Sequence, residues 1–131
     1  MAVRITIRDQ APPSTVTDDS QLDEALQSAA EEARTRNLLG AVLIEAANGN
    51  VISIVVGGEE TVLTFDSSDQ RYYASRGTSD ADEPIMTCFL TMQHHTEFPR
   101  KYVIPVADGV QAVRQFLNSG DLPTCITWEE V

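Results

Sequence analysis

The sequence predicts an α+β fold, in which two helices pack on one face of an antiparallel meander sheet of about six to seven strands. Two observations lead to this prediction. Short apolar runs separated by turn sequences fill the middle of the chain, as in strands joined by hairpins. Two longer segments, one on each side of these runs, repeat apolar residues at helical spacing. The 131 residues have an ordinary globular composition and fit a single domain.

The expected strands are short and are joined by recognisable turns. The first, "VRITIR", alternates apolar and polar residues, as half-buried strands do, and a proline-containing connection follows over residues 9–17. "GAVLIEAA" and "VISIVVG" flank "NGN", which is a strong signal for a β-hairpin. Further strands are expected in "TVLTFD", "RYYASR" and "IMTCFLTMQ", and the last of these is the fifth strand of the run.

The first helix is expected to begin near Ser20 and to end at Asn37 and Gly40. Asp23 follows Ser20 by three positions and forms a weak capping box with it. One stripe of this helix is apolar and should face the sheet. Its members are Leu22, Ala25, Leu26, Ala29, Ala30 and Ala33.

The second helix is expected to begin near Val106, after the irregular segment "HHTEFPRKYVIP". Gly120 ends it, Pro123 prevents its continuation, and "TCITWEE" forms a final strand. We expect the ring of Trp128 to pack against this helix and its indole N–H to find a partner at the sheet edge. The buried face of the helix is predicted to contain Val106, Val110, Val113, Phe116 and Leu117.

The charge balance indicates the kind of partner. Twenty Asp and Glu residues against nine Lys and Arg residues give a formal net charge of −11. Such a surface repels nucleic acids and anionic membranes and attracts cationic proteins, including those that bind nucleic acid, although solubility alone also explains it. The N-terminus lacks the apolar core of a signal peptide, and no apolar run is long enough to cross a membrane. We therefore expect a cytoplasmic protein.

Side chains that could support catalysis are few. His94 and His95 are adjacent, so on a strand they face opposite sides and cannot bind one metal ion together. His95 with Glu97 is one ligand short of a catalytic zinc site. Cys88 and Cys125 each lie in a strand-like apolar run and are expected to be buried free thiols of low reactivity. The sequence therefore predicts no catalytic residues, no metal site, no cofactor and no enzymatic activity.

A protein-binding surface is the stronger expectation. In "RYYASR" one tyrosine should face the core and the other the solvent, and an exposed tyrosine beside arginine is typical of recognition surfaces. The loop "TSDADE" and the chain end "WEEV" carry carboxylate clusters, which in many proteins are simply solvated. The candidate partner-binding residues are Tyr72, Asp80, Asp82, Glu83, Glu129 and Glu130.

The C-terminal segment "IPVADGVQAVRQFLNSGDLPTCITWEEV" resembles the C-terminal signature of the first immunity-protein (Imm) family of bacterial polymorphic toxin systems. The shared features are a proline-led amphipathic helix, a glycine that ends it, a second proline, a strand and a late Trp-Glu pair. "RYYASRG" and "EFPRKYVIP" also fit, so the resemblance covers roughly residues 40 to 131. The matching positions are Tyr73, Gly77, Pro99, Pro105, Phe116, Gly120, Pro123, Trp128 and Glu129.

This resemblance implies that the protein neutralises a cognate toxin in the producing cell by direct binding. Toxins paired with this family are often nucleic-acid deaminases, so a basic deaminase or nuclease domain is the expected partner. Most of the matching positions look like fold determinants rather than contact residues. Two other classes stay open: a small-molecule binding or regulatory module with a pocket between sheet and helices, and a hydrolase that uses His95 and Glu97.

Overall fold

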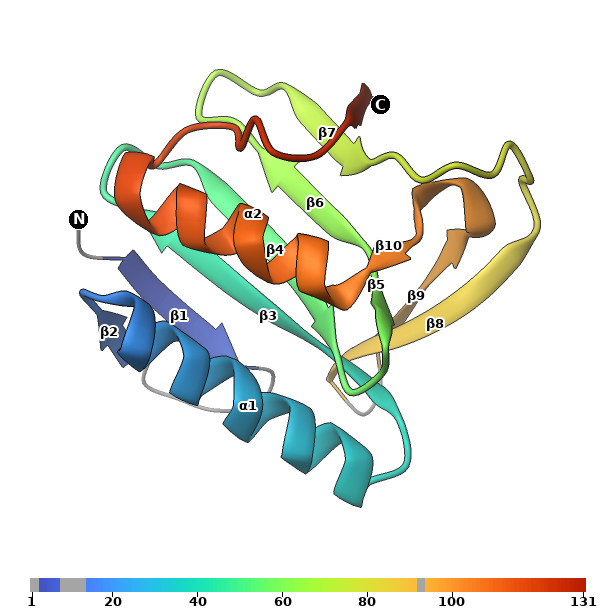
Figure 1. Ribbon diagram of the computed structural model, residues 1–131, viewed down its shortest axis with the longest axis horizontal. Helices are drawn as coiled ribbons and strands as arrows, with labels where there is room; N and C mark the ends of the chain where they lie inside the picture. The colour runs from blue at the N-terminus through green and yellow to red at the C-terminus, as the bar shows by residue number, and fades with distance from the viewer. Residues whose placement is uncertain (1–2, 8–13, 92–93) are drawn as a thin grey trace.

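The computed structural model describes residues 3–7, 14–91 and 94–131, which form two α-helices, one 3₁₀-helix and eleven strands. Both α-helices lie on one face of a large sheet (Figure 1). Within the described residues, no helix is long and apolar enough to span a membrane. In chain order the elements are β1 (Val3–Ile7), β2 (Ser14–Val16), α1 (Asp19–Thr35), β3 (Leu39–Ala46), β4 (Val51–Val56), β5 (Glu60–Thr61), β6 (Leu63–Asp66), β7 (Tyr72–Ser75), β8 (Pro84–Thr91), β9 (His94–Pro99), η1 (Arg100–Tyr102), β10 (Ile104–Pro105), α2 (Val106–Ser119) and β11 (Trp128–Glu130).

The main sheet has the strand order β11-β7-β6-β4-β3-β1-β2, and the β8–β9 hairpin is attached to β3. Strands β3, β4, β6 and β7 pair as the antiparallel meander that the turn sequences predict. The predicted α+β class is therefore confirmed. The described residues form nine strands in this sheet rather than six to seven, and β5 and β10 form a separate two-stranded sheet.

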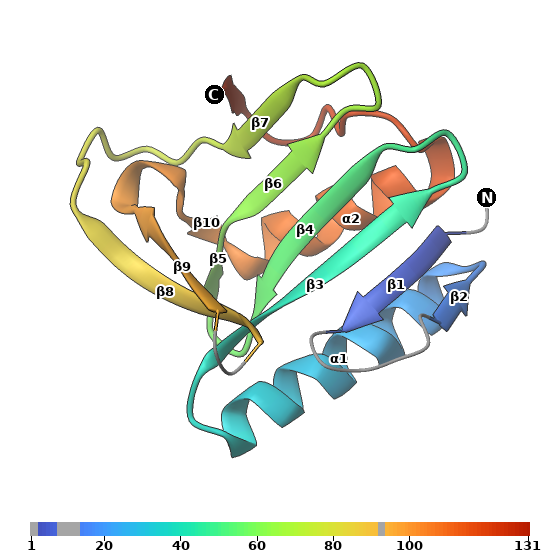
Figure 2. The same ribbon diagram turned by 180° about the vertical axis from the view of Figure 1, so that it is seen from behind.

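The prediction that β8 is the fifth strand of the meander is wrong. β8 does not continue beyond β7; it pairs in parallel with the start of β3 and antiparallel with β9. Figure 2 shows the β8–β9 hairpin running at an angle across the end of β3 and β4. The segment 94–105, predicted to be irregular, contains β9, η1 and β10. Pairing with β8 makes β9 a strand although its own residues do not alternate.

In the N-terminal half the helix begins with a different cap from the one predicted. The N-cap is Asp18, whose side chain accepts a backbone hydrogen bond from the first turn, so the capping box of Ser20 and Asp23 is wrong. Asn37 adopts the left-handed conformation (φ 56°) after the helix, as expected, whereas Gly40 lies inside β3. The predicted connection over residues 9–17 also contains β2, which pairs with β1.

In the C-terminal half α2 begins at Val106 and is followed by Gly120 at φ 71°, both as predicted. The final strand is shorter than the expected "TCITWEE", because β11 covers only its last three residues. Cys125 therefore lies outside the strand and is exposed, so the prediction of a buried thiol there is wrong, while Cys88 on β8 is buried as predicted.

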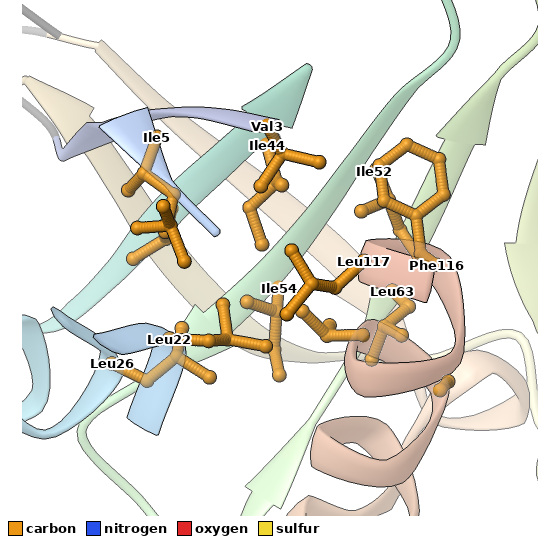
Figure 3. Close-up of a cluster of buried hydrophobic side chains, with 14 of the residues drawn as sticks. Val3, Ile5, Leu22, Leu26, Ile44, Ile52, Ile54, Leu63, Phe116 and Leu117 are labelled. Carbon is orange, nitrogen blue, oxygen red and sulfur yellow. The ribbon is translucent and has the colours of Figure 1, made fainter. Parts of the chain in front are cut away.

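The main hydrophobic core lies between the sheet and the two helices (Figure 3). Branched aliphatic residues of the central strands form its floor, and the helices contribute leucines and one phenylalanine. Its largest fully buried side chains include Ile5, Leu22, Ile44, Ile52, Ile54, Leu63, Phe116 and Leu117.

The buried face of α2 differs from the predicted one. Gly109 and Ala112 are buried, whereas Val106 and Val110 are only partly covered. A Cβ atom on Gly109 would lie 2.7 Å from Thr61 Cγ2, which shows how closely the helix approaches β5 at this point. Because α2 contacts the sheet most closely at Gly109, Val106 and Val110 lie on the side of the helix that faces α1.

A second, smaller core lies on the opposite face of the sheet. Ala41 and Val55 point away from the helices and are covered by Met86 and Cys88 of β8. Tyr102, next to the hairpin in space, packs against the same cluster. The hairpin and η1 thus cover one end of the face that the helices leave open.

Candidate functional site

The predicted partner-binding residues lie at the edge of the sheet formed by β7 and β11. β11 pairs antiparallel with β7, so the start of β11 lies beside the end of β7, where the loop to β8 begins, and the end of the chain lies beside Tyr72 (Figure 1). Tyr72 belongs to β7, three of the carboxylates to the loop, and two to β11; these residues are Asp80, Asp82, Glu83, Glu129 and Glu130.

Arg76 connects this loop to the rest of the protein. Its Nη1 donates hydrogen bonds to the carbonyl oxygens of Ser79 (2.6 Å) and Lys101 (2.9 Å). Its Nη2 donates to Asp80 Oδ1 (2.6 Å), and its Nε lies 3.7 Å from Glu129 Oε1. One guanidinium therefore holds the loop, η1 and β11 together.

A second ion pair crosses the same region. Lys101 Nζ lies 2.8 Å from Asp82 Oδ1. The hydrogen bond from Lys101 lowers the pKa of the Asp82 carboxyl, and the same bond raises the pKa of Lys101. The side chains of Arg76 and Lys101 are 23% and 25% exposed, whereas those of Asp80 and Asp82 are 96% and 82% exposed. The cations lie beneath the carboxylates, so an approaching protein meets negative charge first.

The two terminal glutamates face opposite sides of the sheet. Glu130 is opposite Tyr73, which packs against the main core, so its side chain is on the helix side. Glu129 is opposite Ala74 and shares the other face with Tyr72, which is 48% exposed. The prediction that one tyrosine faces inward and one outward is confirmed. Of the two glutamates, only Glu129 lies on the same face as Tyr72.

Glu129 is held from a second direction by Tyr102. The Tyr102 hydroxyl forms a hydrogen bond with the Glu129 carboxylate; burial raises the pKa of Tyr102, and this bond raises it further. Lys101 Nζ lies 5.3 Å from the centre of the Tyr102 ring. The Glu129 carboxylate is thus fixed between Tyr102 and Arg76.

Gly77 allows the loop to lie directly against the chain after η1. Its N–H donates a 2.7 Å hydrogen bond to the carbonyl of Lys101, and a Cβ atom here would clash with the carbonyl oxygen of Val103. Pro99 precedes η1 and Pro105 precedes α2, so both bound the segment on which the loop rests. These three positions of the C-terminal signature shape the region around Arg76.

The other signature positions act in packing and chain reversal. Phe116 is fully buried, and its ring centre lies 5.9 Å from that of Phe65. The ring centre of Trp128 lies 6.2 Å from that of the same Phe65, and Trp128 packs against the main core, to which α2 contributes. Its Nε1–H donates to the carbonyl of Pro123 (2.8 Å), just before the final strand. Gly120 supplies the left-handed turn between these elements.

The residues considered for catalysis, Cys88, His94, His95 and Glu97, belong to the β8–β9 hairpin. Burial raises the pKa of Cys88 to about 11, so this thiol is protonated at neutral pH. The ring of His95 lies 5.8 Å from that of Phe89, Glu97 on the same strand is exposed, and His94 belongs to β9. Among the described residues, no three His, Cys, Asp or Glu side chains are placed to bind one metal ion.

A groove of about 360 Å³ separates part of α1 from part of α2. Leu26 and Ala30 of α1 form one wall, Val106 and Val110 of α2 form the other, and Ile54 of β4 lies at the base. Helical spacing alone predicted the two valines to be buried. Both are only partly buried, because α2 lies closest to the sheet at Gly109, and helical periodicity gives no signal for this.

A larger cavity, of about 500 Å³, lies beside Arg76 between the loop after β7 and the segment before β11. Asp108 and Cys125 line it, and the sequence did not indicate either as a site residue. The walls come from three segments, residues 76–78, 103–108 and 125–127, so no local motif could have revealed this cavity.

The comparison with protein families gives a match over almost the whole chain. The model described as "Immunity protein Imm1" matches residues 10–130. A comparison with curated proteins finds no match. The matched range includes α1, the sheet from β2 onward, the Arg76 region and all of β11. The chain therefore belongs to the Imm1 family of immunity proteins.

Proposed function

We propose that this chain protects the cell that makes it by binding a cognate toxin directly, without catalysing a reaction. Membership of the immunity-protein family supports the inhibition of a toxin. The observation that carries the proposed location is the exposure of the Asp80 and Asp82 carboxylates above the half-buried Arg76 and Lys101.

The binding surface that we propose consists of Tyr72, Asp80, Asp82, Glu83 and Glu129; we call it the acidic loop surface. The carboxylates of Asp80, Asp82 and Glu129 are held by ion pairs and hydrogen bonds to the protein body, which lowers the entropy lost when a partner orders them. Tyr72 adds an exposed aromatic ring, the type of side chain that contributes strongly to protein interfaces. Glu130 is left out of this surface because it faces the helix side.

The toxin that fits this surface is a basic domain that acts on nucleic acid in the cytoplasm, such as a deaminase or a nuclease. The net charge of −11 supports this proposal because it accelerates association with a cationic partner. Carboxylates on the acidic loop surface would occupy the groove in which the toxin binds phosphates. Association should therefore slow markedly as the salt concentration rises.

The test is a pull-down with the C-terminal domain of the protein encoded immediately upstream of this chain's gene. We expect a stable 1:1 complex and restored growth of cells that express that domain. A control protein carries lysines in place of Asp80, Asp82, Glu83 and Glu129; it should remain folded and fail to rescue growth. Absence of binding by the folded wild-type protein would contradict the proposed function. Rescue of growth by the lysine variant would contradict the proposed location of the binding surface.

The groove between the helices favours a second candidate function, the binding of a small apolar molecule. Its volume of about 360 Å³ lies within the range of small-molecule sites, and its walls are mostly aliphatic. Arg114 and Asp23 join the two helices through hydrogen bonds of 2.8 and 3.2 Å, so the groove has a fixed wall spacing. A metabolite that raises the melting temperature of the wild type but not of Val110→Glu would support this function.

A further inference from the structure

The 500 Å³ cavity beside Arg76 opens next to the acidic loop surface. Arg76 belongs to both features: it lines the cavity, and it holds the carboxylates of Asp80 and Glu129. The loop that carries Asp80 forms one wall of the cavity through Thr78. The cavity and the acidic loop surface therefore share a border at Arg76 and Thr78.

The chemistry of the cavity is mixed. Pro105 and Ile126 supply apolar wall, while Thr78 and Thr127 supply hydroxyl groups. Asp108, in the first turn of α2, is an exposed carboxylate at the wall. A ligand that fits must therefore offer apolar surface and a hydrogen-bond donor for the Asp108 carboxylate.

The charges in the cavity favour a cation. Arg76 is the cation among its lining residues, and Asp80 and Glu129 already neutralise it. In the part of the chain that the structure describes, no cation pairs with Asp108. An acidic side chain would be repelled by this carboxylate, and a purely apolar one would bury it without a partner, which is costly.

We propose that this cavity is the anchor site for one arginine or lysine side chain of the toxin, with its charged end at the Asp108 carboxylate. The aliphatic stem of such a side chain packs against Pro105 and Ile126, and its head donates hydrogen bonds to Asp108. This inference rests on the proposed function and adds to it the position of one buried contact. Interfaces concentrate their binding energy in such pockets, and arginine is enriched there.

A purely structural role for Asp108 makes a different prediction. The N-cap of α2 is Pro105, which makes no side-chain capping hydrogen bond, and an aspartate in the first turn interacts favourably with the helix dipole. If this is its whole role, Asp108→Asn lowers the melting temperature slightly and leaves toxin binding unchanged. Measuring affinity and stability on the same variant separates the two roles.

The first arm of the test compares Asp108→Asn with Asp121→Asn, using the C-terminal domain of the upstream neighbour's product as the probe. Asp121 is an exposed carboxylate just beyond the other end of α2, so both variants remove the same charge near the same helix. We expect Asp108→Asn to weaken binding about 30-fold or more, chiefly through faster dissociation, and Asp121→Asn to change it less than about 3-fold. Circular dichroism confirms that both variants are folded.

The second arm uses Cys125 as a reporter inside the cavity. Cys125 is exposed and Cys88 is buried, so iodoacetamide reacts with Cys125 in the native protein. We expect toxin binding to slow this alkylation at least tenfold, because the bound domain covers the cavity.

The anchor site is supported only if both results are obtained. Suppose that the wild-type complex forms. If Cys125 is then not protected, or if Asp108→Asn binds with normal affinity, the anchor site is wrong and the proposed function is unaffected. Failure of the wild-type protein to bind the toxin domain would overturn both proposals. The two failures are therefore distinguishable in one set of measurements.

Discussion

Arg76 donates a 2.6 Å hydrogen bond to Asp80, and the two side chains differ sharply in exposure, at 23% and 96%. The guanidinium is anchored below by the carbonyl oxygens of Ser79 and Lys101. An exposed carboxylate is thereby fixed in position by a half-buried cation. Such preorganisation lets a surface charge contribute to recognition with little loss of side-chain entropy on binding.

Neutralising the loop should slow toxin association. We expect the triple variant Asp80→Asn, Asp82→Asn and Glu83→Gln to lower the association rate constant about tenfold at low salt, because electrostatic steering is lost. The dependence of this rate on salt should weaken in parallel. Stopped-flow or surface-plasmon-resonance measurements across a salt series provide the check.

The matched control removes the same charge elsewhere. Glu24 on α1, Glu97 on β9 and Asp121 after α2 are all exposed, and their triple conversion to amides gives the same net charge. This control should associate at a rate within about twofold of the wild type if the position of the charge matters. Equal slowing by both variants would show that only the net charge acts, and would contradict a special role of the acidic loop surface.

Replacing Arg76 should loosen the loop as well as weaken binding. Arg76→Ala removes hydrogen bonds to two carbonyl oxygens and leaves Glu129 and Asp80 without their shared cation. We expect a loss of about 1–3 kcal/mol in the free energy of unfolding, measured by denaturant titration. Hydrogen exchange of residues 77–83 should accelerate. Arg71→Ala, at an exposed ion pair, is the control and should reduce the free energy of unfolding much less than Arg76→Ala does.

Gly77 is expected to tolerate no side chain. A Cβ atom there would overlap the carbonyl oxygen of Val103, so Gly77→Ala must displace the loop from the chain after η1. We expect this variant to lose about 1–3 kcal/mol of stability in thermal or denaturant unfolding. At Gly58 the nearest atom to a new Cβ, Leu39 Cδ2, is 3.4 Å away, so Gly58→Ala should change stability by less than about 1 kcal/mol. Equal effects at both positions would refute the steric explanation.

Local patterns predicted most elements of the fold but not their distant pairings. The alternation in β1, the "NGN" hairpin and the glycine after α2 depend on neighbouring residues, and each was predicted correctly. β9 is a strand because it pairs with β8, and β8 pairs with β3, which is distant in the chain. Pairings of this kind are decided by tertiary packing, which overrides local propensity. The same holds for α2, where a glycine rather than the two flanking valines faces the sheet.

The candidate site was predictable only in part, for the same reason. Alternation along β7 correctly separated Tyr72 from Tyr73, because it depends on one strand alone. The partners of the loop carboxylates could not be predicted, since Lys101 comes from η1 on another part of the chain. Asp108 and Cys125 line the same cavity only because α2 and the segment before β11 both contribute to its walls. Charged segments are visible in a sequence, but which of them lie side by side depends on the tertiary fold.

The two cysteines should differ in reactivity and in their effect on pH stability. Ellman's reagent should modify one thiol in the native protein, Cys125, and both in denaturant, while Cys125→Ser should leave the native protein unreactive. Burial raises the pKa of Cys88 from 9.0 to about 11, so the folded state binds this proton more tightly than the unfolded state.

This contribution to stability is complete below pH 9 and is lost as pH rises from 9 toward about 11, because the unfolded chain ionises first. The free energy of unfolding should fall by no more than about 1.4 kcal/mol per pH unit through this thiol. Denaturant titrations of the wild type and of Cys88→Ala between pH 8 and about 11 test it. A slope that is identical in the two proteins would show that the Cys88 thiol does not titrate differently on folding.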